Sequence, residues 1–207
     1  MRSLIGVFGK SQGDYKPVLK QLADMGYTSV EAASYKDGLL YGTPPQQFRR
    51  DVEATGMKVL STHCTLNLSD KQLATGDFTE ALKWWDECIA AHKAAGVEYI
   101  VVPSMRRIET LDGLATYCRY FNEVGARCKA AGIKFGYHNH SREFEKVEDR
   151  VMLDYMLENT DPDKVFFQMD VYWTVMGQAS PVDYFTKYPG RFRLLHIKDR
   201  REVGQSG

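Results

Sequence analysis

Four segments of the chain share one pattern of apolar and polar positions. In each segment an amphipathic run with helical spacing ends at a glycine, and a short apolar run with a polar end begins two residues later. The glycines are Gly26, Gly56, Gly96 and Gly132, which are separated by 30, 40 and 36 residues. Glycine suits the left-handed position that closes a helix. The repeat therefore predicts successive helix–strand units of a parallel sheet.

With the opening and closing segments included, the pattern predicts seven strands with helices between them. The predicted strands are Leu4–Phe8, Ser29–Ala33, Lys58–His63, Glu98–Val102, Lys134–Asn139, Val165–Asp170 and Phe192–Ile197. The predicted helices are Tyr15–Met25, Pro45–Thr55, Phe78–Ala95, Leu111–Ala131 and Arg150–Asn159. The strand segments are nearly continuously apolar, which is typical of a parallel sheet covered on both faces.

Strict alternation of strands and helices leaves two fold classes, an open doubly wound sheet and a TIM (β/α)8-type barrel. No G-x-G-x-x-G or Walker loop follows the first predicted strand, which argues against a nucleotide-binding sheet. We therefore predict an α/β fold, a TIM barrel, formed by a single domain over residues 1–207. Only Asp199–Gly207 follow the seventh strand. An eighth strand and helix need about 20–30 residues more, so we expect them to be missing.

Composition narrows the class of function. Lys+Arg and Asp+Glu are both 27, so the formal net charge is zero and the basic excess of a nucleic-acid-binding protein is absent. The four cysteines form no C-x-x-C pair and are expected to be buried thiols. The sequence shows no signal peptide and no apolar run of about 20 residues. We expect a cytoplasmic protein with neither a nucleic-acid nor a membrane partner.

Chemistry-bearing residues gather at the carboxyl ends of the predicted strands, where barrels place their active sites. These residues are Glu31, His63, His138 with His140, Asp170 and His196. Asp, Glu and His make up 32 of 207 residues, about 15% of positions, whereas five of the seven strand ends carry one. Imidazole and carboxylate without thiolate suit an open site for Mn, Co, Zn, Fe or Mg. Such an ion can stabilise an enediolate formed by proton abstraction.

Each strand-end residue also has a purely structural interpretation. Asp170 could cap the following turn, and His196 could be a hydrogen-bonded core histidine. His63 could serve only its neighbouring loop, and Glu31 could be an ion-pair partner at the barrel mouth. Sequence spacing does not separate these roles from metal or substrate binding.

The residues beyond the strand ends have two interpretations as well. His140 and Glu143 follow the fifth strand, so they could stabilise a loop or take part in catalysis, with Glu143 as the candidate base. Trp173 could pack within the protein or against the C–H face of a sugar. Lys198 lies two residues past His196, on the same side of its strand, and could stabilise an oxyanion.

Five motifs together resemble a known family. They are GYTSVE, GMKVLSTH, GIKFGYHNHSREF, FQMDVYW and RFRLLHIKD, and they cover essentially the whole chain. The set closely resembles the xylose isomerase-like TIM-barrel superfamily of sugar phosphate isomerases and epimerases, in the branch with a Y-H-N-H segment. The resemblance implies one divalent metal ion. It also implies isomerisation, epimerisation or a related proton abstraction next to a carbonyl, on sugars, inositol derivatives or keto-sugars.

The resemblance also implies ligands. Asp170 matches the family's ligand on strand six and His196 the ligand on strand seven. His138 stands where the family usually has a glutamate, so the fifth-strand ligand is either His138 or Glu143. The usual strand-eight glutamate has no counterpart in the chain. Trp173 stands where epimerase relatives carry a substrate-contacting histidine, which makes a plain ketose 3-epimerase less favoured.

The sequence thus predicts a divalent-metal-dependent sugar isomerase or epimerase that works through an enediolate. The metal ligands are expected to be His138, Asp170 and His196, the catalytic residues Glu143 and Lys198, and the substrate-binding residues Glu31, His63, His140 and Trp173. The alternatives are a 3-keto-glycoside lyase and a non-catalytic sugar-binding barrel. An abasic-site endonuclease relative would need more ligands and a basic face. The exposed edges of an incomplete barrel would favour a homodimer.

Overall fold

The computed structural model describes residues 14–198, which divide into two compact units. The first unit comprises the described part of residues 1–64 together with 79–101 and 127–134. The second comprises residues 65–78, 102–126 and the described part of 135–207. The predicted strand Leu4–Phe8 lies outside the described residues. That the chain forms a single domain stays a prediction.

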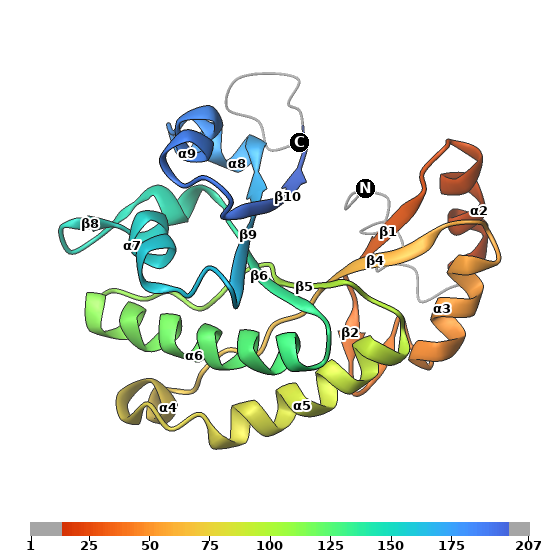
Figure 1. Ribbon diagram of the computed structural model, residues 1–207, viewed down its shortest axis with the longest axis horizontal. Coiled ribbons are helices and arrows are strands. Elements are labelled where there is room, and N and C mark those ends of the chain that lie inside the picture. The colour runs from red at the N-terminus through yellow and green to blue at the C-terminus, as the bar shows by residue number, and fades with distance from the viewer. Residues whose placement is uncertain (1–13, 199–207) are drawn as a thin grey trace. The chain divides into compact units, whose positions relative to one another are not determined.

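The first unit is built on three parallel strands in the order β1-β4-β5. Its strands are β1 (Ser29–Ala32), β4 (Lys58–His63) and β5 (Tyr99–Val102), with a small antiparallel hairpin of β2 (Tyr35–Lys36) and β3 (Leu39–Leu40). Its helices are α2 (Lys16–Asp24), α3 (Pro45–Glu53) and α5 (Thr79–Ala94) (Figure 1). These helices bury one apolar stripe each, for example Phe48 and Val52 of α3, as amphipathic helices on a sheet do.

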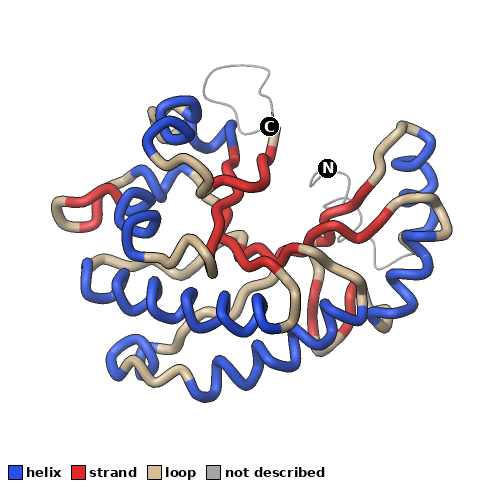
Figure 2. Tube along the Cα trace, in the orientation of Figure 1, coloured by secondary structure: helices blue, strands red, loops and turns tan. Residues whose placement is uncertain are grey.

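The second unit also has three parallel strands, in the order β6-β9-β10. They are β6 (Lys134–His138), β9 (Val165–Asp170) and β10 (Phe192–His196), drawn in red in Figure 2 with the hairpin of β7 (Lys146–Val147) and β8 (Arg150–Val151). The helices are α4 (Asp70–Thr75), most of α6 (Leu111–Ala130), η1 (Ser141–Phe144), α7 (Met152–Asn159), α8 (Val171–Met176) and α9 (Pro181–Lys187). None of the helices described is long and apolar enough to cross a bilayer.

The helix–strand pattern predicted from the sequence is confirmed over the described residues, with boundaries that agree within two residues. The four repeat glycines have the predicted left-handed backbone, with φ of 89°, 82°, 73° and 82° at Gly26, Gly56, Gly96 and Gly132. All four cysteines are buried free thiols, as expected. Helices α4, α8 and α9 were not predicted because six or seven residues are too few to show a helical period.

One expectation about the strands holds only in part. All six residues of β9 are buried, as expected for a strand covered on both faces. In β10 no residue is fully buried, and Leu195 is 53% exposed. Among the described residues β10 pairs only with β9, so it is an edge strand. Every second residue of β10 is exposed, so one face of the strand is uncovered.

Gly125 marks the closest approach between α6 and the segment that precedes β9. A Cβ at Gly125 would lie 2.3 Å from the backbone oxygen of Lys164, which cannot move aside as a side chain could. Gly→Ala inside a helix normally gains about 1 kcal/mol, but overpacking against backbone costs about 1–3 kcal/mol or more. We expect Gly125→Ala to lower the free energy of unfolding by about 2 kcal/mol in urea titrations.

Gly113 supplies the matched control on the same helix. A Cβ there would meet side chains alone: those of Ile108 and Thr110 at 3.1 and 3.2 Å, and that of Leu73 at 4.0 Å. Because these side chains can shift, Gly113→Ala should stay within about 1 kcal/mol of the wild type. Equal losses in both variants would contradict the assignment of the Gly125 effect to the Lys164 backbone.

Candidate metal centre

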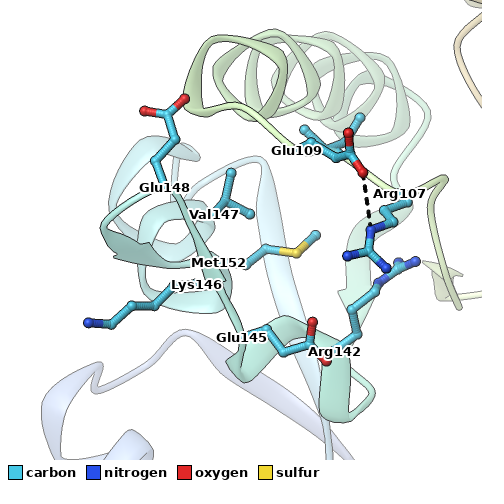
Figure 3. A pocket seen from close by; sticks show the side chains of 9 residues that line it. Arg107, Glu109, Arg142, Glu145, Lys146, Val147, Glu148 and Met152 are labelled. Carbon is cyan, nitrogen blue, oxygen red and sulfur yellow. Dashed lines mark ion pairs between the residues drawn. The ribbon is translucent and has the colours of Figure 1, made fainter.

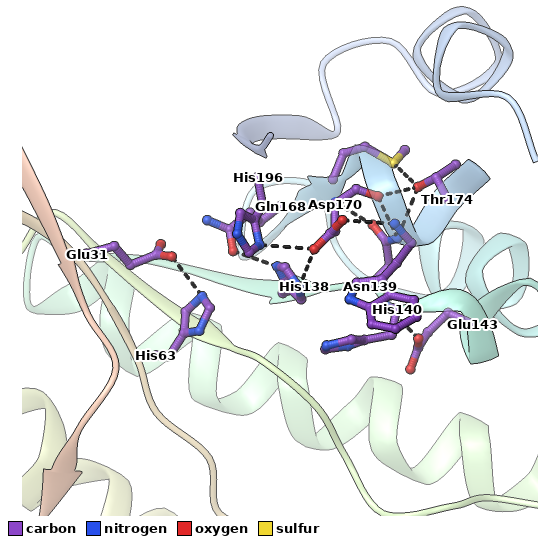
Figure 4. A network of polar contacts seen from close by, with 12 residues as sticks. Glu31, His63, His138, Asn139, His140, Glu143, Gln168, Asp170, Thr174 and His196 are labelled. Atoms are coloured by element: carbon purple, nitrogen blue, oxygen red, sulfur yellow. Dashed lines mark hydrogen bonds and ion pairs between the residues drawn. The ribbon is translucent and has the colours of Figure 1, made fainter. Parts of the chain in front are cut away.

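The second unit brings together three residues from the carboxyl ends of its three parallel strands. His138 ends β6, Asp170 ends β9 and His196 ends β10 (Figure 4). The register pairs His196 directly with Asp170, so the two side chains leave the same edge of the sheet. Because the three residues end adjacent parallel strands, one carboxylate and two imidazoles lie close together.

The donor atoms of these residues face one another. Asp170 Oδ2 lies 3.4 Å from His138 Nε2 and 3.0 Å from His196 Nδ1. All three candidate ligand atoms lie within 4.8 Å of one another. Ligands about 2.1 Å from a common ion lie about 3.0–3.4 Å apart at angles near 90–110°. The spacing on both sides of the carboxylate therefore fits a shared divalent ion.

The hydrogen bond behind His138 gives a second test of this fit. His138 Nδ1 lies 2.8 Å from Gln168 Oε1, and a carbonyl oxygen can only accept, so Nδ1 carries the proton. In a neutral ring Nε2 is then the lone-pair atom, and it faces the acceptor Asp170 Oδ2. Two facing acceptors need a proton or a cation between them. A carboxylate or carbonyl behind a ligating histidine is also the usual arrangement in metal sites.

Asp170 is buried but stays ionised. Burial by itself raises the pKa of its carboxyl, but the contacts with His138 and His196 and the backbone N–H of Trp173 outweigh burial and hold that pKa well below its usual range. The carboxylate also caps α8, because Asp170 Oδ1 accepts from Trp173 N at 2.9 Å. The structural and the metal interpretation of Asp170 thus use different oxygens of one side chain.

The group has one side toward solvent. The side chains of His138 and Asp170 are fully buried, whereas that of His196 is 14% exposed. With three protein donors an ion keeps open coordination positions, as catalytic sites require. Substrate oxygens could fill those positions.

Two supporting residues were not predicted from the sequence. Asn139 holds the Asp170 backbone, since its Oδ1 accepts from Asp170 N at 3.1 Å and its Nδ2 donates to Thr174 Oγ1 at 3.1 Å. Gln168 orients His138, as described above. The sequence did contain an indication of the role of Gln168. Gln168 is a polar residue within an apolar strand, and it lies two residues before Asp170 and therefore on the same face of that strand.

Further side chains extend the group along the same unit. The ring centroid of His140 lies 4.8 Å from that of His138 and 5.6 Å from that of Trp173. Lys198 Nζ lies 5.4 Å from the Trp173 ring centroid and 4.6 Å from that of Tyr172, within cation–π range. Three residues predicted to bind substrate or an oxyanion therefore lie in a row beside the candidate ligands.

Glu143 is near in sequence but occupies a different place. It is fully buried as the third residue of η1, and both of its oxygens accept hydrogen bonds. Oε1 accepts from the Tyr137 hydroxyl at 2.7 Å, and Oε2 accepts from His140 N at 2.7 Å. Arg142 adds an ion pair at 3.3 Å. This geometry supports a role in fixing the loop that carries His140, rather than metal ligation.

Glu31 and His63 belong to the first unit, where they contact each other. His63 Nε2 lies 3.0 Å from Glu31 Oε1, and the Ser61 hydroxyl donates to Glu31 Oε2. The ion-pair interpretation of Glu31 therefore has a partner of the expected kind. Their role in substrate binding stays a prediction.

A surface pocket of about 220 Å³ in the second unit is separate from this group (Figure 3). It is lined by Arg107, Ile108, Glu109, Arg142, Glu145, Lys146, Val147, Glu148 and Met152. Neither His138, Asp170 nor His196 lines it, so this pocket is not the candidate metal centre.

Comparison with known families agrees with this architecture. The fold and the strand-end residues define an α/β barrel protein with candidate metal ligands at the carboxyl ends of its strands. The family described as xylose isomerase-like TIM barrel matches residues 19–207, and the chain belongs to it. The predicted fold class is therefore confirmed.

Its relatives include enzymes of more than one reaction type. The chain is 24% identical to an inosose dehydratase of Geobacillus kaustophilus, over 89% of its own length and 61% of that relative's length. It is 36% identical to a solved sugar phosphate isomerase/epimerase from Parabacteroides distasonis, with a TM-score of 0.84, covering 97% of this chain and 80% of that one. A D-psicose 3-epimerase structure is 13% identical with a TM-score of 0.65, over 94% and 72% of the two chains, which shows the shared fold alone.

Proposed function

We propose that the chain is the metal-binding part of a sugar isomerase or epimerase that removes a proton next to a carbonyl. The observation that carries the proposal is the convergence of His138 Nε2, Asp170 Oδ2 and His196 Nδ1 at three adjacent strand ends. One divalent ion held there (Mn, Co, Zn or Mg) would polarise the carbonyl of a bound keto-sugar and stabilise the enediolate.

Four further side chains are assigned the remaining roles in the proposed reaction. His140 lies beside His138 on the Trp173 side, so we assign it the acceptance of the substrate proton. Lys198 is positively charged and packs over Trp173, from where it can stabilise a developing oxyanion. Trp173 offers an aromatic face for the C–H side of a sugar ring. Glu143 holds the backbone of His140 in place.

Because His140 is assigned as the general base, Glu143 no longer has the catalytic role that was expected from the sequence. A general base has to come within hydrogen-bond reach of the substrate proton. Both Glu143 oxygens accept hydrogen bonds inside the protein, and the side chain has no exposed surface. His140 is partly exposed and adjoins the candidate ligands.

A lyase is the second candidate, favoured by the relative named inosose dehydratase. Loss of water beside a carbonyl begins with the same proton abstraction as epimerisation, and then needs a proton donor for the leaving hydroxyl. His140 or Lys198 could supply that proton. The two reactions therefore use one site and differ in the fate of the enediolate.

Solvent exchange tests the shared step. The protein is loaded with Mn and incubated in deuterium oxide with a panel of ketoses, 3-keto-glycosides and keto-cyclitols. We expect deuterium at the carbon next to the carbonyl, with inverted or shifted products for an epimerase or isomerase and dehydrated or cleaved products for a lyase. Saturable sugar binding without exchange would contradict catalysis and support a sugar-binding barrel.

A further inference from the structure

A second group of ligand-type side chains lies in the first unit, apart from the residues used above. Cys64 directly follows β4, and Cys88 and His92 lie one turn apart on α5. Their exposures are 5%, 0% and 0%. Cys64 Sγ lies 3.2 Å from Cys88 Sγ, and Cys88 Sγ lies 3.4 Å from His92 Nδ1. We propose that Cys64, Cys88 and His92 form a second, thiolate-containing metal site for a divalent ion such as zinc.

The donor spacing fits this ion. In a tetrahedral zinc site two sulfurs are each about 2.3 Å and an imidazole nitrogen about 2.1 Å from the metal. Two such sulfurs lie about 3.8 Å apart, and sulfur and nitrogen about 3.6 Å apart. The observed sulfur–sulfur and sulfur–nitrogen separations are smaller by about 0.6 and about 0.2 Å, so side-chain movements of that size open the space. The i,i+4 spacing of Cys88 and His92 puts both donors on one helix face.

Charge determines what kind of ion the site takes. Burial, and then the neighbouring Cys64, raise the pKa of the Cys88 thiol far above its ordinary value. A divalent cation that displaces both thiol protons leaves two thiolates, one neutral imidazole and no net charge. Such a neutral group can be buried, whereas a lone thiolate cannot. Thiolate donors also select zinc over magnesium or calcium.

His92 has a feature that ordinary core packing leaves unexplained. Its Nδ1 donates to the Cys88 carbonyl at 2.7 Å, and its Nε2 is buried with no hydrogen-bond partner among the described residues. Metal binding through Nδ1 would break its hydrogen bond to the Cys88 carbonyl, move the ring proton to Nε2 and turn the Nδ1 lone pair toward the ion. The Tyr35 ring packs on His92 with centroids 4.7 Å apart, and its hydroxyl contacts the Cys88 thiol. The Tyr35 hydroxyl is therefore a candidate for a fourth position.

Cobalt substitution tests the site in the full chain. The protein is produced in minimal medium with cobalt, purified with a phosphine reductant, and scanned in the near ultraviolet for thiolate-to-cobalt charge transfer. The candidate centre of His138, Asp170 and His196 has no thiolate, so this absorption reports only on the proposed site. We expect the band in the wild type and in Asp170→Ala, with about one cobalt per chain in the latter.

Substitutions then assign the ligands. Cys88→Ala and His92→Phe should lose the band, whereas Cys128→Ala, a buried cysteine of the same unit outside the group, should keep it. If a ligand variant does not fold, the wild-type spectrum still decides, together with bleaching of its band by zinc. No charge-transfer band in folded, reduced wild type would overturn the proposal. A band that persists in folded Cys88→Ala, or a Cys64–Cys88 disulfide in place of metal, would overturn it too.

Discussion

Asp170→Asn is expected to abolish stoichiometric metal binding at the candidate centre and to lower turnover by more than about 100-fold, while the protein stays folded. Losing only an outer partner of a metal ligand costs about 10–100-fold, so losing the charged ligand should cost more. Asn keeps an oxygen that can accept from Trp173 N, so the cap of α8 survives. Elemental analysis after dialysis against Mn measures the first effect, and solvent exchange the second.

Comparison of Asp170→Ala with Asp170→Asn distinguishes the helix-capping role of Oδ1 from the metal-binding role proposed for Oδ2. Alanine removes the cap as well as the ligand, and an N-cap is worth about 1 kcal/mol. We therefore expect equal metal loss in both variants and about 1 kcal/mol lower stability in the alanine variant alone. Wild-type metal content in folded Asp170→Asn would remove Asp170 from the ligand set.

Glu143→Ala is expected to lower the free energy of unfolding by about 4 kcal/mol, because two donors lose a charged acceptor worth about 1.5–3 kcal/mol each. These donors are the buried Tyr137 hydroxyl and the backbone N–H of His140. Urea denaturation measures the loss. The neighbouring Glu145 is exposed, so Glu145→Ala should stay within about 0.5 kcal/mol of the wild type.

Glu143→Gln tests whether Glu143 is a base or a positioning residue. Loss of a general base lowers the rate by about 10²–10⁴-fold. Glutamine fills the same space and keeps one acceptor, so a positioning role predicts a loss of only about tenfold and an unchanged pH profile. His140→Gln should show the large loss instead. A large loss of rate in Glu143→Gln, with wild-type stability and metal content, would show that Glu143 and not His140 is the general base.

The candidate metal centre shows which site residues could be predicted from the sequence and which could not. His138, Asp170 and His196 could be found because parallel strands of a barrel end at one rim, so position along the chain implies proximity in space. The roles of Gln168 and Asn139 could not be assigned, since they depend on which neighbouring atom each amide faces. Glu143 was chosen as a base for its nearness to His138, but sequence spacing does not reveal that its oxygens are already in use.

The sequence by itself determined the order and kind of the main elements and the strand ends that carry ligand-type residues. These follow from local properties: apolar periodicity, and glycine at positions that need a left-handed backbone, as Gly96 shows. Only the tertiary structure decided which oxygen of Asp170 caps α8 and which faces the imidazoles. It alone brought Cys64 to Cys88 and His92, 24 and 28 residues along the chain. The reason is that side-chain contacts depend on packing between elements, which no local pattern encodes.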